Sequence, residues 1–384
     1  MVHAGSHASF VQASKDLAAL AEVSISRERV RRWTQRIGQQ RAAEVQAAAE
    51  AYAQLPLPAR RQSPLDQIPS VACVEADGGR IQILKRKAAR DDDAQGHWRE
   101  TLVGSLLSMS SLEHAHDPCP TIPQTFVDPR RMRDLSRGIK GFCADADPDE
   151  SAPEDAPLDR PERPVVLVRS VLATRAGVEA FGARLVAAAH ARGFHAARRK
   201  AFVADGAASN WSVHKKHFSH YTPILDLTHA ICYVYQAAMA GRAAKAGWQA
   251  YLRWAQLLWS GQTSELIAAV AARVAELGRP AENAADGSPA VVVADALRYL
   301  TNQRTRMKYA EYRRIGLPIT SSHVESTIKQ VNRRVKGTEK FWDQGAEPIL
   351  NLVADHLSET DQLDRFWKRR PRTLGTTRCY QSAA

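Results

Sequence analysis

Residues 198–211 read Arg-Arg-Lys-Ala-Phe-Val-Ala-Asp-Gly-Ala-Ala-Ser-Asn-Trp, a short apolar run that ends abruptly on Asp205 and Gly206. The pattern predicts a buried strand that brings a carboxylate to its C-terminal end. A sharp exit at the glycine and a helix capped by Ser209 or Asn210 should follow. Open α/β sheets carry their chemistry at that edge. An ordinary surface turn also explains a lone Asp-Gly pair, so the rest of the chain must decide.

The composition is that of a folded, strongly basic protein. The chain has 384 residues, of which 44% are hydrophobic, enough for a sizeable core divided into two or three units. Its formal net charge of +12 favours an anionic partner, such as nucleic acid or an acidic membrane surface. Long apolar runs and a signal-peptide pattern are absent, so we expect a cytoplasmic protein. Scattered cysteines without a CxxC pair argue against a disulfide framework or a zinc ribbon.

Near the N-terminus, residues 17–38 predict two helices with a polar break between them, the outline of a helix-turn-helix. The second helix is expected to be capped by Ser26 and to continue until the prolines after residue 55. Val30, Trp33 and Ile37 form its inward apolar stripe. An ordinary solvated pair of helices is equally compatible with this pattern. If the segment binds DNA, the candidate contacts are the arginines that lie mostly off the stripe: Arg27, Arg29, Arg31, Arg32 and Arg36.

The next part of the chain predicts an antiparallel meander of three strands. Residues 71–75 lead to Asp77 and Gly78, an alternating run follows over residues 80–84, and residues 98–107 return after a charged loop. Asp-Gly is a common hairpin signal, so a purely structural role also explains Asp77.

Farther along, helices alternate with strands. The acidic, proline-rich residues 144–164 predict a flexible surface insertion. After it we expect helices at residues 174–192, 211–218 and 229–239, and strands at residues 198–205 and 221–226. The resulting order is β-β-β-α-β-α-β-α, an α/β fold with a mixed sheet.

The chain thus divides into five expected segments. The N-terminal helical region (1–62) precedes the first part of an α/β core (63–240), a helical insertion (241–314), the return to the core (315–360) and a basic tail (361–384). Trp248 and Trp259 of the insertion are expected to pack in its core. The tail interleaves aromatic and basic residues, which suits nucleic-acid contact but is also common in disordered ends.

Glu325 stands on the first turn of the helix that opens the last core segment. Ser322 and Glu325 match the S-x-x-E capping box, which gives this acid a structural alternative. Lys329, four residues on, offers a second alternative, a helix ion pair. The same helix is strongly basic and suited to DNA through Lys329, Arg333, Arg334 and Lys336.

Three acids, Asp77, Asp205 and Glu325, each stand at the border of an element, an arrangement that resembles the DDE transposases. More specifically, the chain resembles the Kra-type insertion-sequence transposases, whose catalytic domain is ribonuclease-H-like with a helical insertion before the glutamate. The resembling segments are residues 75–83 (Glu-Ala-Asp-Gly-Gly-Arg-Ile-Gln-Ile), 96–101 (Gly-His-Trp-Arg-Glu-Thr), 203–206 with Trp211, 224–230, and 316–337. One departure is Ser-Ser-His at residues 321–323, where the family has a glycine-containing turn.

The resemblance implies a metal-dependent DNA strand transferase. Asp77, Asp205 and Glu325 would be its catalytic acids and would hold two Mg²⁺ or Mn²⁺ ions, with Asp77 bridging both. Water attack at a transposon end would free a 3′ hydroxyl, which would then attack target DNA. Without metal, the clustered carboxylates should raise the pKa of at least one of them. Asp226 and His229 resemble a family Asp-x-x-His element with a supporting role.

The implied partners are double-stranded DNA, as transposon ends and target, and a second copy of the chain, because pairing two ends requires at least a dimer. Two alternatives remain open at this point. One is a transposase-derived DNA-binding protein without catalysis, and the other is a stand-alone ribonuclease-H-like nuclease. The helical insertion and the basic residues after Glu325 favour transposition over the nuclease, because synapsis needs extra DNA surface.

Overall fold

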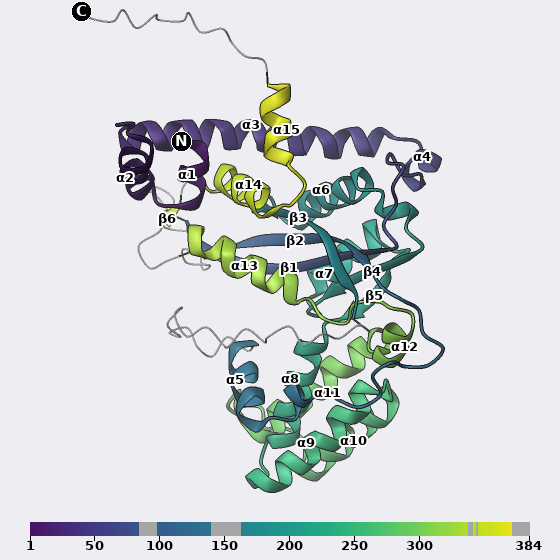
Figure 1. The fold of residues 1–384 in the computed structure, drawn as a ribbon. Helices are drawn as coiled ribbons and strands as arrows, with labels where there is room; N and C mark the ends of the chain where they lie inside the picture. The colour runs from purple at the N-terminus through teal and green to yellow at the C-terminus, as the bar shows by residue number, and fades with distance from the viewer. Residues whose placement is uncertain (84–97, 140–162, 337–340, 343–344, 371–384) are drawn as a thin grey trace, which may run out of the picture.

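A computed structural model describes residues 1–83, 98–139, 163–336, 341–342 and 345–370. Their centre is an open mixed sheet in the order β3-β2-β1-β4-β5, so the chain is an α/β protein (Figure 1). β2 is antiparallel to both β1 and β3, whereas β4 and β5 run parallel to β1. The strands are β1 Val71–Ile83, β2 Trp98–Ser110, β3 Val165–Thr174, β4 Arg199–Ala204 and β5 Thr222–Leu225, and the short β6 Phe341–Trp342 pairs with the end of β1.

The predicted hairpin at Asp77 and Gly78 is wrong. The chain runs straight through this point, because Asp77 pairs with Val103 and Gly78 with Leu102 in one uninterrupted ladder. Gly78 does not adopt the positive φ that a tight hairpin turn needs. The third strand is instead Val165–Thr174, which the sequence analysis did not predict. Residues 144–162 of the expected acidic insertion lie outside the described residues.

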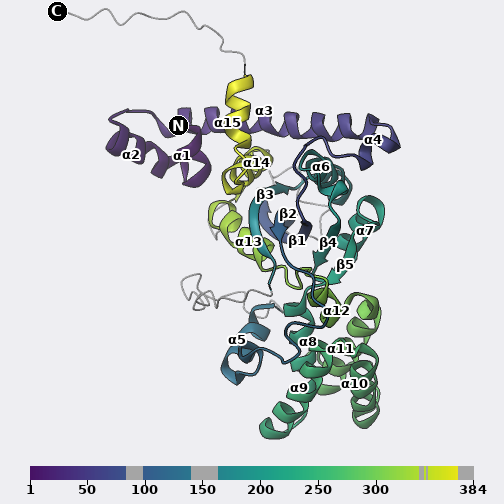
Figure 2. The same ribbon diagram turned by 45° about the vertical axis from the view of Figure 1, so that its right-hand side comes forward.

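Helices cover both faces of the sheet (Figure 2). On one face, α13 Ser322–Val335 and α14 Ala346–Leu357 share a hydrophobic core with Ile81, Val103 and Val171. The other face is covered by α6 Val178–Ala191 and α7 Ala208–His217. The expected helix at residues 174–192 therefore begins four residues later, because Thr174 still pairs with Leu102 in the sheet.

The N-terminal helices are α1 Val2–His7, α2 Phe10–Ala21, α3 Arg27–Gln54 and α4 Leu57–Arg61. Ser26 caps α3 as predicted, its Oγ accepting a hydrogen bond from the amide of Arg29 at 3.3 Å. Val30 and Ile37 are fully buried. The long α3 packs against α14 and α6 and lies along the β3 side of the sheet (Figure 1). Val45 and Tyr52 in its second half pack against the main hydrophobic core.

A second group of helices lies beyond the β5 end of the sheet, at the bottom of Figure 1. It contains α5 Pro129–Ile139, α8 Leu227–Met239, α9 Ala244–Trp259, α10 Thr263–Leu277, α11 Pro289–Gln303 and α12 Tyr309–Arg314, with short 3₁₀ turns at Gln124–Phe126 and Arg304–Arg306. A third 3₁₀ turn, Phe194–Ala196, follows α6 in the core. Trp259 is buried there as expected, whereas Trp248 is half-buried. None of the described helices combines the length and the apolar character needed to cross a membrane.

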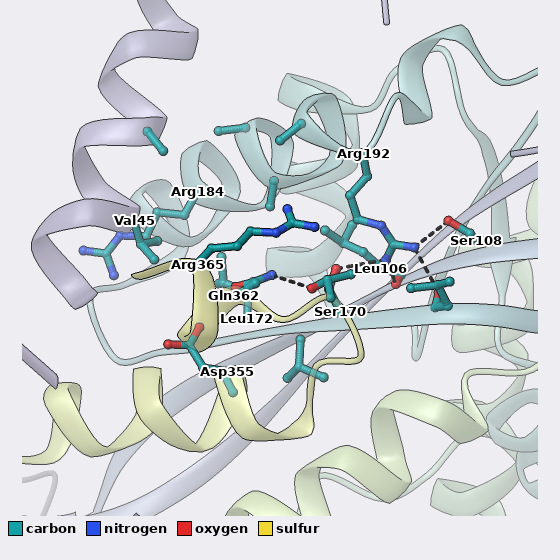
Figure 3. Close-up of a pocket in the computed structure, with 18 of the residues that line it drawn as sticks. Val45, Leu106, Ser108, Ser170, Leu172, Arg184, Arg192, Asp355, Gln362 and Arg365 are labelled. Atoms are coloured by element: carbon teal, nitrogen blue, oxygen red, sulfur yellow. Dashed lines mark hydrogen bonds between the residues drawn. The ribbon is translucent and has the colours of Figure 1, made fainter. Parts of the chain in front are cut away.

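A cavity of about 970 Å³ opens over β3, between α3, α6, α14 and α15 Gln362–Arg369 (Figure 3). The guanidinium of Arg192 crosses it and donates hydrogen bonds to the carbonyl of Val168 at 3.0 Å and to Oγ of Ser170 at 2.9 Å. These contacts join α6 to the edge strand. None of the acids singled out in the sequence lines this cavity.

Candidate active site

Three aspartates stand at the same level on three neighbouring parallel strands. Ala76 on β1 pairs with Ala204 on β4, which pairs with Leu225 on β5. The residue that follows each of these three positions is an aspartate: Asp77, Asp205 and Asp226. The amide of Asp226 also donates to the carbonyl of Ala204 at 2.8 Å, which continues the parallel ladder by one step. The sheet register thus brings acids far apart in sequence to one edge.

The helix α13 faces this edge of the sheet. Residues alternate along β1, and a side chain added at Gly79 would meet Ile328 of α13 at 3.8 Å. Ile81, two residues on, shares a buried cluster with Val324 of α13. Asp77 points to the same side by this alternation, toward the helix that carries Glu325.

The buried Asp226 connects β5, α8 and the start of α13. Its Oδ2 accepts the amide of His229 at 2.8 Å, which caps α8. The same oxygen lies 2.8 Å from Nδ1 of His229, and its Oδ1 accepts the amide of Ser321 at 2.7 Å. A single carboxylate therefore fixes both the ring of His229 and the turn that precedes Glu325.

Glu325 lies beside this pair. Its Oε1 is 3.8 Å from Nδ1 of His229, and it is buried without a hydrogen-bond partner among the described residues. The capping-box alternative does not fit, because α13 begins at Ser322 and its N-cap is Ser321, with no side-chain cap. No ion pair joins Glu325 to Lys329 in the described part of the chain. The first turn of α13 therefore does not use the Glu325 carboxylate.

Glu75 performs the capping role instead, and the sequence analysis missed it. This fully buried acid lies two residues before Asp77 on β1, and its Oε2 accepts the amide of Val324 at 2.7 Å. The signal in the sequence was an acid at an alternate position of a strand that is otherwise apolar. Burial, partly offset by the Val324 amide, raises the pKa of Glu75 well above its usual range.

Asp205 is held by the turn that follows it. Its Oδ1 accepts the amide of Ala207 at 3.0 Å and the side-chain amide of Asn210 at 2.9 Å, and within the described residues Oδ2 makes no hydrogen bond. The predicted capping by Ser209 or Asn210 is wrong, because α7 begins at Ala208 without a side-chain cap. Gly206 adopts a φ of 100°, as the sharp exit requires.

The helical insertion supports the ends of β4 and β5. Tyr299 of α11 donates its hydroxyl to the carbonyl of Asp205 at 2.7 Å, and Gln303 donates to the carbonyl of Gly206 at 3.1 Å. Tyr309 donates to the carbonyl of Leu225 at 3.0 Å. The sequence analysis did not select these residues, because their partners are backbone carbonyls that leave no mark in the sequence.

The electrostatics of the site agree with clustered carboxylates. Burial, reinforced by the charge of Asp205, raises the pKa of Asp77 to about 6. Burial and the charge of Asp226 raise the pKa of Glu325 to about 7, although His229 opposes the shift. Burial alone would lower the pKa of His229, but its hydrogen bond to Asp226 and the nearby acids raise it to about 9. His229 is therefore an imidazolium at neutral pH, surrounded by acids.

The residues fit a hard divalent cation. Ligand atoms of Asp226, His229 and Glu325 lie within 4.8 Å of one another, but those of Asp77, Asp205 and Glu325 do not form so tight a trio among the described residues. The predicted acids still offer oxygens without protein partners, Oδ2 of Asp205 and Oε1 of Glu325. Such oxygens suit Mg²⁺ or Mn²⁺, whereas Nδ1 of His229 is engaged by Asp226 at 2.8 Å.

The predicted DNA-contacting residues divide by exposure. Lys329 and Arg333 are exposed on α13, and Lys336 is exposed directly after its last residue. Arg334 is an exception and a wrong prediction: it is buried, and its Nη2 donates to the carbonyl of Gly5 at 3.0 Å. The α3 residues Arg27, Arg29, Arg31, Arg32 and Arg36 are all exposed, although Arg31 pairs with Glu28 at 2.7 Å.

Comparisons with known proteins add no family: no protein-family model matches the chain, and no curated protein is significantly similar to it.

Proposed function

We propose that the chain is a transposase of a bacterial insertion sequence, with a ribonuclease-H-like core that cleaves and joins DNA at the Asp77, Asp205 and Glu325 site. The observation that carries the proposal is the alignment of Asp77 and Asp205 on neighbouring strands, with Glu325 on the helix facing them. The strand order β3-β2-β1-β4-β5, with only β2 reversed, supports the same core.

In this proposal the acids position the reacting phosphate. Mg²⁺ bound by the three carboxylates would stabilise charge on the attacking and leaving oxygens of the in-line displacement. Asp77 lies on the strand next to that of Asp205 and on the face of the sheet that packs against α13, so it would suit a cation shared with either of the other two acids. The pKa values near neutrality let Asp77 and Glu325 lose their protons as the cation binds.

The Asp226 and His229 pair serves as a positioning device. Asp226 holds the amide of Ser321 and orients the imidazolium of His229, whose Nδ1 lies near Glu325. His229 offsets the mutual repulsion of the acids before the cation arrives. Neither residue needs to contact DNA for this role.

DNA would approach along α13. Lys329 is exposed on that helix and Lys336 directly after its end, both beyond the turn that carries Glu325. The exposed arginines of α3 offer a second basic surface. The helix α3 lies on the other side of α14 from α13 (Figure 2). Two separated basic surfaces fit a protein that holds an element end and a target at once.

The test uses the purified full chain and the DNA that flanks its reading frame. Mg²⁺-dependent nicking at terminal inverted repeats, followed by joining of the new 3′ end to a second DNA, is the expected result. Salt-sensitive binding without cleavage would instead indicate a DNA-binding protein. Cleavage without joining and without preference for the repeats would indicate a nuclease.

A further inference from the structure

A cluster of three histidines lies where the first helix meets α14, well separated in the chain from the acidic site. His3 and His7 stand one turn apart on α1, and His356 comes from the last turn of α14. Their ring centroids are 4.3 to 4.4 Å apart, and one ring nitrogen of each lies within 4.8 Å of the others.

One ring nitrogen of this cluster is buried without a hydrogen-bond partner in the described part of the chain, and another ring has its tautomer fixed by the backbone. Nε2 of His356 is buried and has no partner among the described residues. A buried polar nitrogen without a partner is costly, so it calls for an explanation. Nδ1 of His7 lies 3.1 Å from the carbonyl of His3, which can only accept, so Nδ1 carries the proton. The lone pair of His7 is then on Nε2, and a backbone carbonyl fixing the tautomer is the usual outer support of a metal-binding histidine.

The backbone beneath the cluster is held firmly. Gly5 packs so closely on α3 that an added side chain would lie 2.2 Å from Oγ1 of Thr34. The carbonyl of Gly5 accepts a hydrogen bond from the buried Arg334 of α13 at 3.0 Å. These contacts fix α1 relative to α3 and α13, and both of those helices pack against α14, so the meeting of His3, His7 and His356 is set by the fold.

We propose that His3, His7 and His356 form a site for a borderline divalent transition-metal ion, such as Zn²⁺, Co²⁺ or Ni²⁺, that links the first helix to α14. Imidazole suits these ions and is a poor ligand for Mg²⁺. Tetrahedral bonds of about 2.0–2.1 Å place two ligand nitrogens roughly 3.3 Å apart, so the rings must close by about 1.5 Å at most. His3 and His7 are exposed and can rotate toward the half-buried His356. Their exposure also leaves a coordination position open to water.

The charge state of the rings agrees with this role. Burial, with His7 and His3 nearby, lowers the pKa of His356 to about 3, so its ring is neutral at pH 7. A metal ion requires that neutral form. The charged groups that act on these rings are the other histidines and, for His3, the N-terminal amine, and all of them disfavour a further positive charge on the cluster.

The experiment measures Zn²⁺ binding to the full chain, without an affinity tag because a histidine tag would bind the ion. The protein is stripped of metal, saturated with Mg²⁺ to occupy the carboxylate site, and titrated with Zn²⁺ against a chromophoric chelator. We expect one tight site, and a Kd weakened at least tenfold in both His356→Gln and His7→Gln. His7 is exposed, so His7→Gln tests the site without the risk of misfolding.

Two further variants locate the ion. His116→Gln changes an exposed histidine outside the cluster and should leave the Kd unchanged, as should Asp205→Asn in the acidic site. Zn²⁺ should also raise the Tm of the wild type and of His116→Gln, but not that of His7→Gln. Equal Zn²⁺ affinity in the wild type, His7→Gln and His356→Gln would overturn the proposal.

Discussion

The side chain of Glu75 on β1 accepts a hydrogen bond from the backbone amide of Val324 on α13 at 2.7 Å, across 249 positions in the chain. The bond ties the central strand to the first turn of the helix that carries Glu325. Asp77 lies two residues after Glu75 on the strand, and Glu325 follows Val324 on the helix. The hydrogen bond therefore fixes the positions of both acids relative to each other. The candidate site is therefore organised by an acid that is not proposed to be catalytic.

Replacing Glu75 tests this joint. Glu75→Gln keeps an oxygen that can accept the Val324 amide, so we expect a folded protein with near-normal cleavage. Glu75→Ala leaves that buried amide unpaired and should lower the free energy of unfolding by about 1–3 kcal/mol. Urea unfolding and Mg²⁺-dependent DNA cleavage measure the two effects. If both variants behave alike in cleavage and stability, the hydrogen bond does not organise the site.

Glu325→Gln separates the catalytic from the structural interpretation of this residue. The first turn of α13 is already satisfied by Glu75 and Asp226, and burial disfavours the charge of Glu325, so the metal-free variant should be at least as stable as the wild type. Cleavage should fall by about a hundredfold or more, because an ionised ligand is lost. A variant that loses stability but keeps cleavage would restore the capping-box interpretation.

His229→Gln should make the stability of the protein less dependent on pH above neutrality. The pKa of His229 is raised to about 9 in the folded state, so its contribution is fully present below about pH 6.5 and lost as the pH rises through 9. We expect a cost of about 3 kcal/mol near pH 6 that shrinks near pH 9.5. Urea unfolding at both pH values, with His116→Gln as the control, measures it. A constant cost would mean that His229 is not charged in the folded protein.

Mg²⁺ should bind more tightly as the pH rises through the pKa values of Asp77 and Glu325, about 6 and about 7. Folded-state pKa values above the unfolded ones mean that the metal-free protein loses stability as the pH rises from about 4 to about 7. A bound cation offsets that loss, because it favours the ionised form. The rise in Tm on adding Mg²⁺ should therefore be larger near pH 8 than near pH 5.5. An equal rise at both values would place the ion elsewhere.

The sequence predicted the elements that depend on local patterns. The strand before Asp205, the cap at Ser26 and the helix after Asp226 follow from apolar runs and local side-chain contacts, and the structure contains them. The number of core strands agrees only because two errors cancel: the single strand Val71–Ile83 was predicted as two strands, and the strand Val165–Thr174 was missed.

What the sequence could not predict depends on distant partners. Asp77-Gly78 has the local signature of a hairpin, yet both residues stay extended because β2 pairs with them throughout. Arg334 resembles its basic neighbours in sequence, but packing places it beneath α1, where it binds the carbonyl of Gly5. Nothing in the sequence around Glu75 shows which group it binds, because its hydrogen-bond partner, the amide of Val324, lies on the distant helix α13. In each case a tertiary contact overrides the local pattern.

The most direct test of the central claim is DNA cleavage and strand joining by Asp205→Asn, measured with Mg²⁺ and DNA carrying the ends that flank the reading frame. Asparagine keeps the oxygen that holds Ala207 and Asn210, so the variant should fold and bind DNA as the wild type does. The exposed Asp286→Asn is the matched control. We predict that Asp205→Asn loses cleavage and joining while Asp286→Asn keeps both. Wild-type activity in Asp205→Asn would contradict the proposed site.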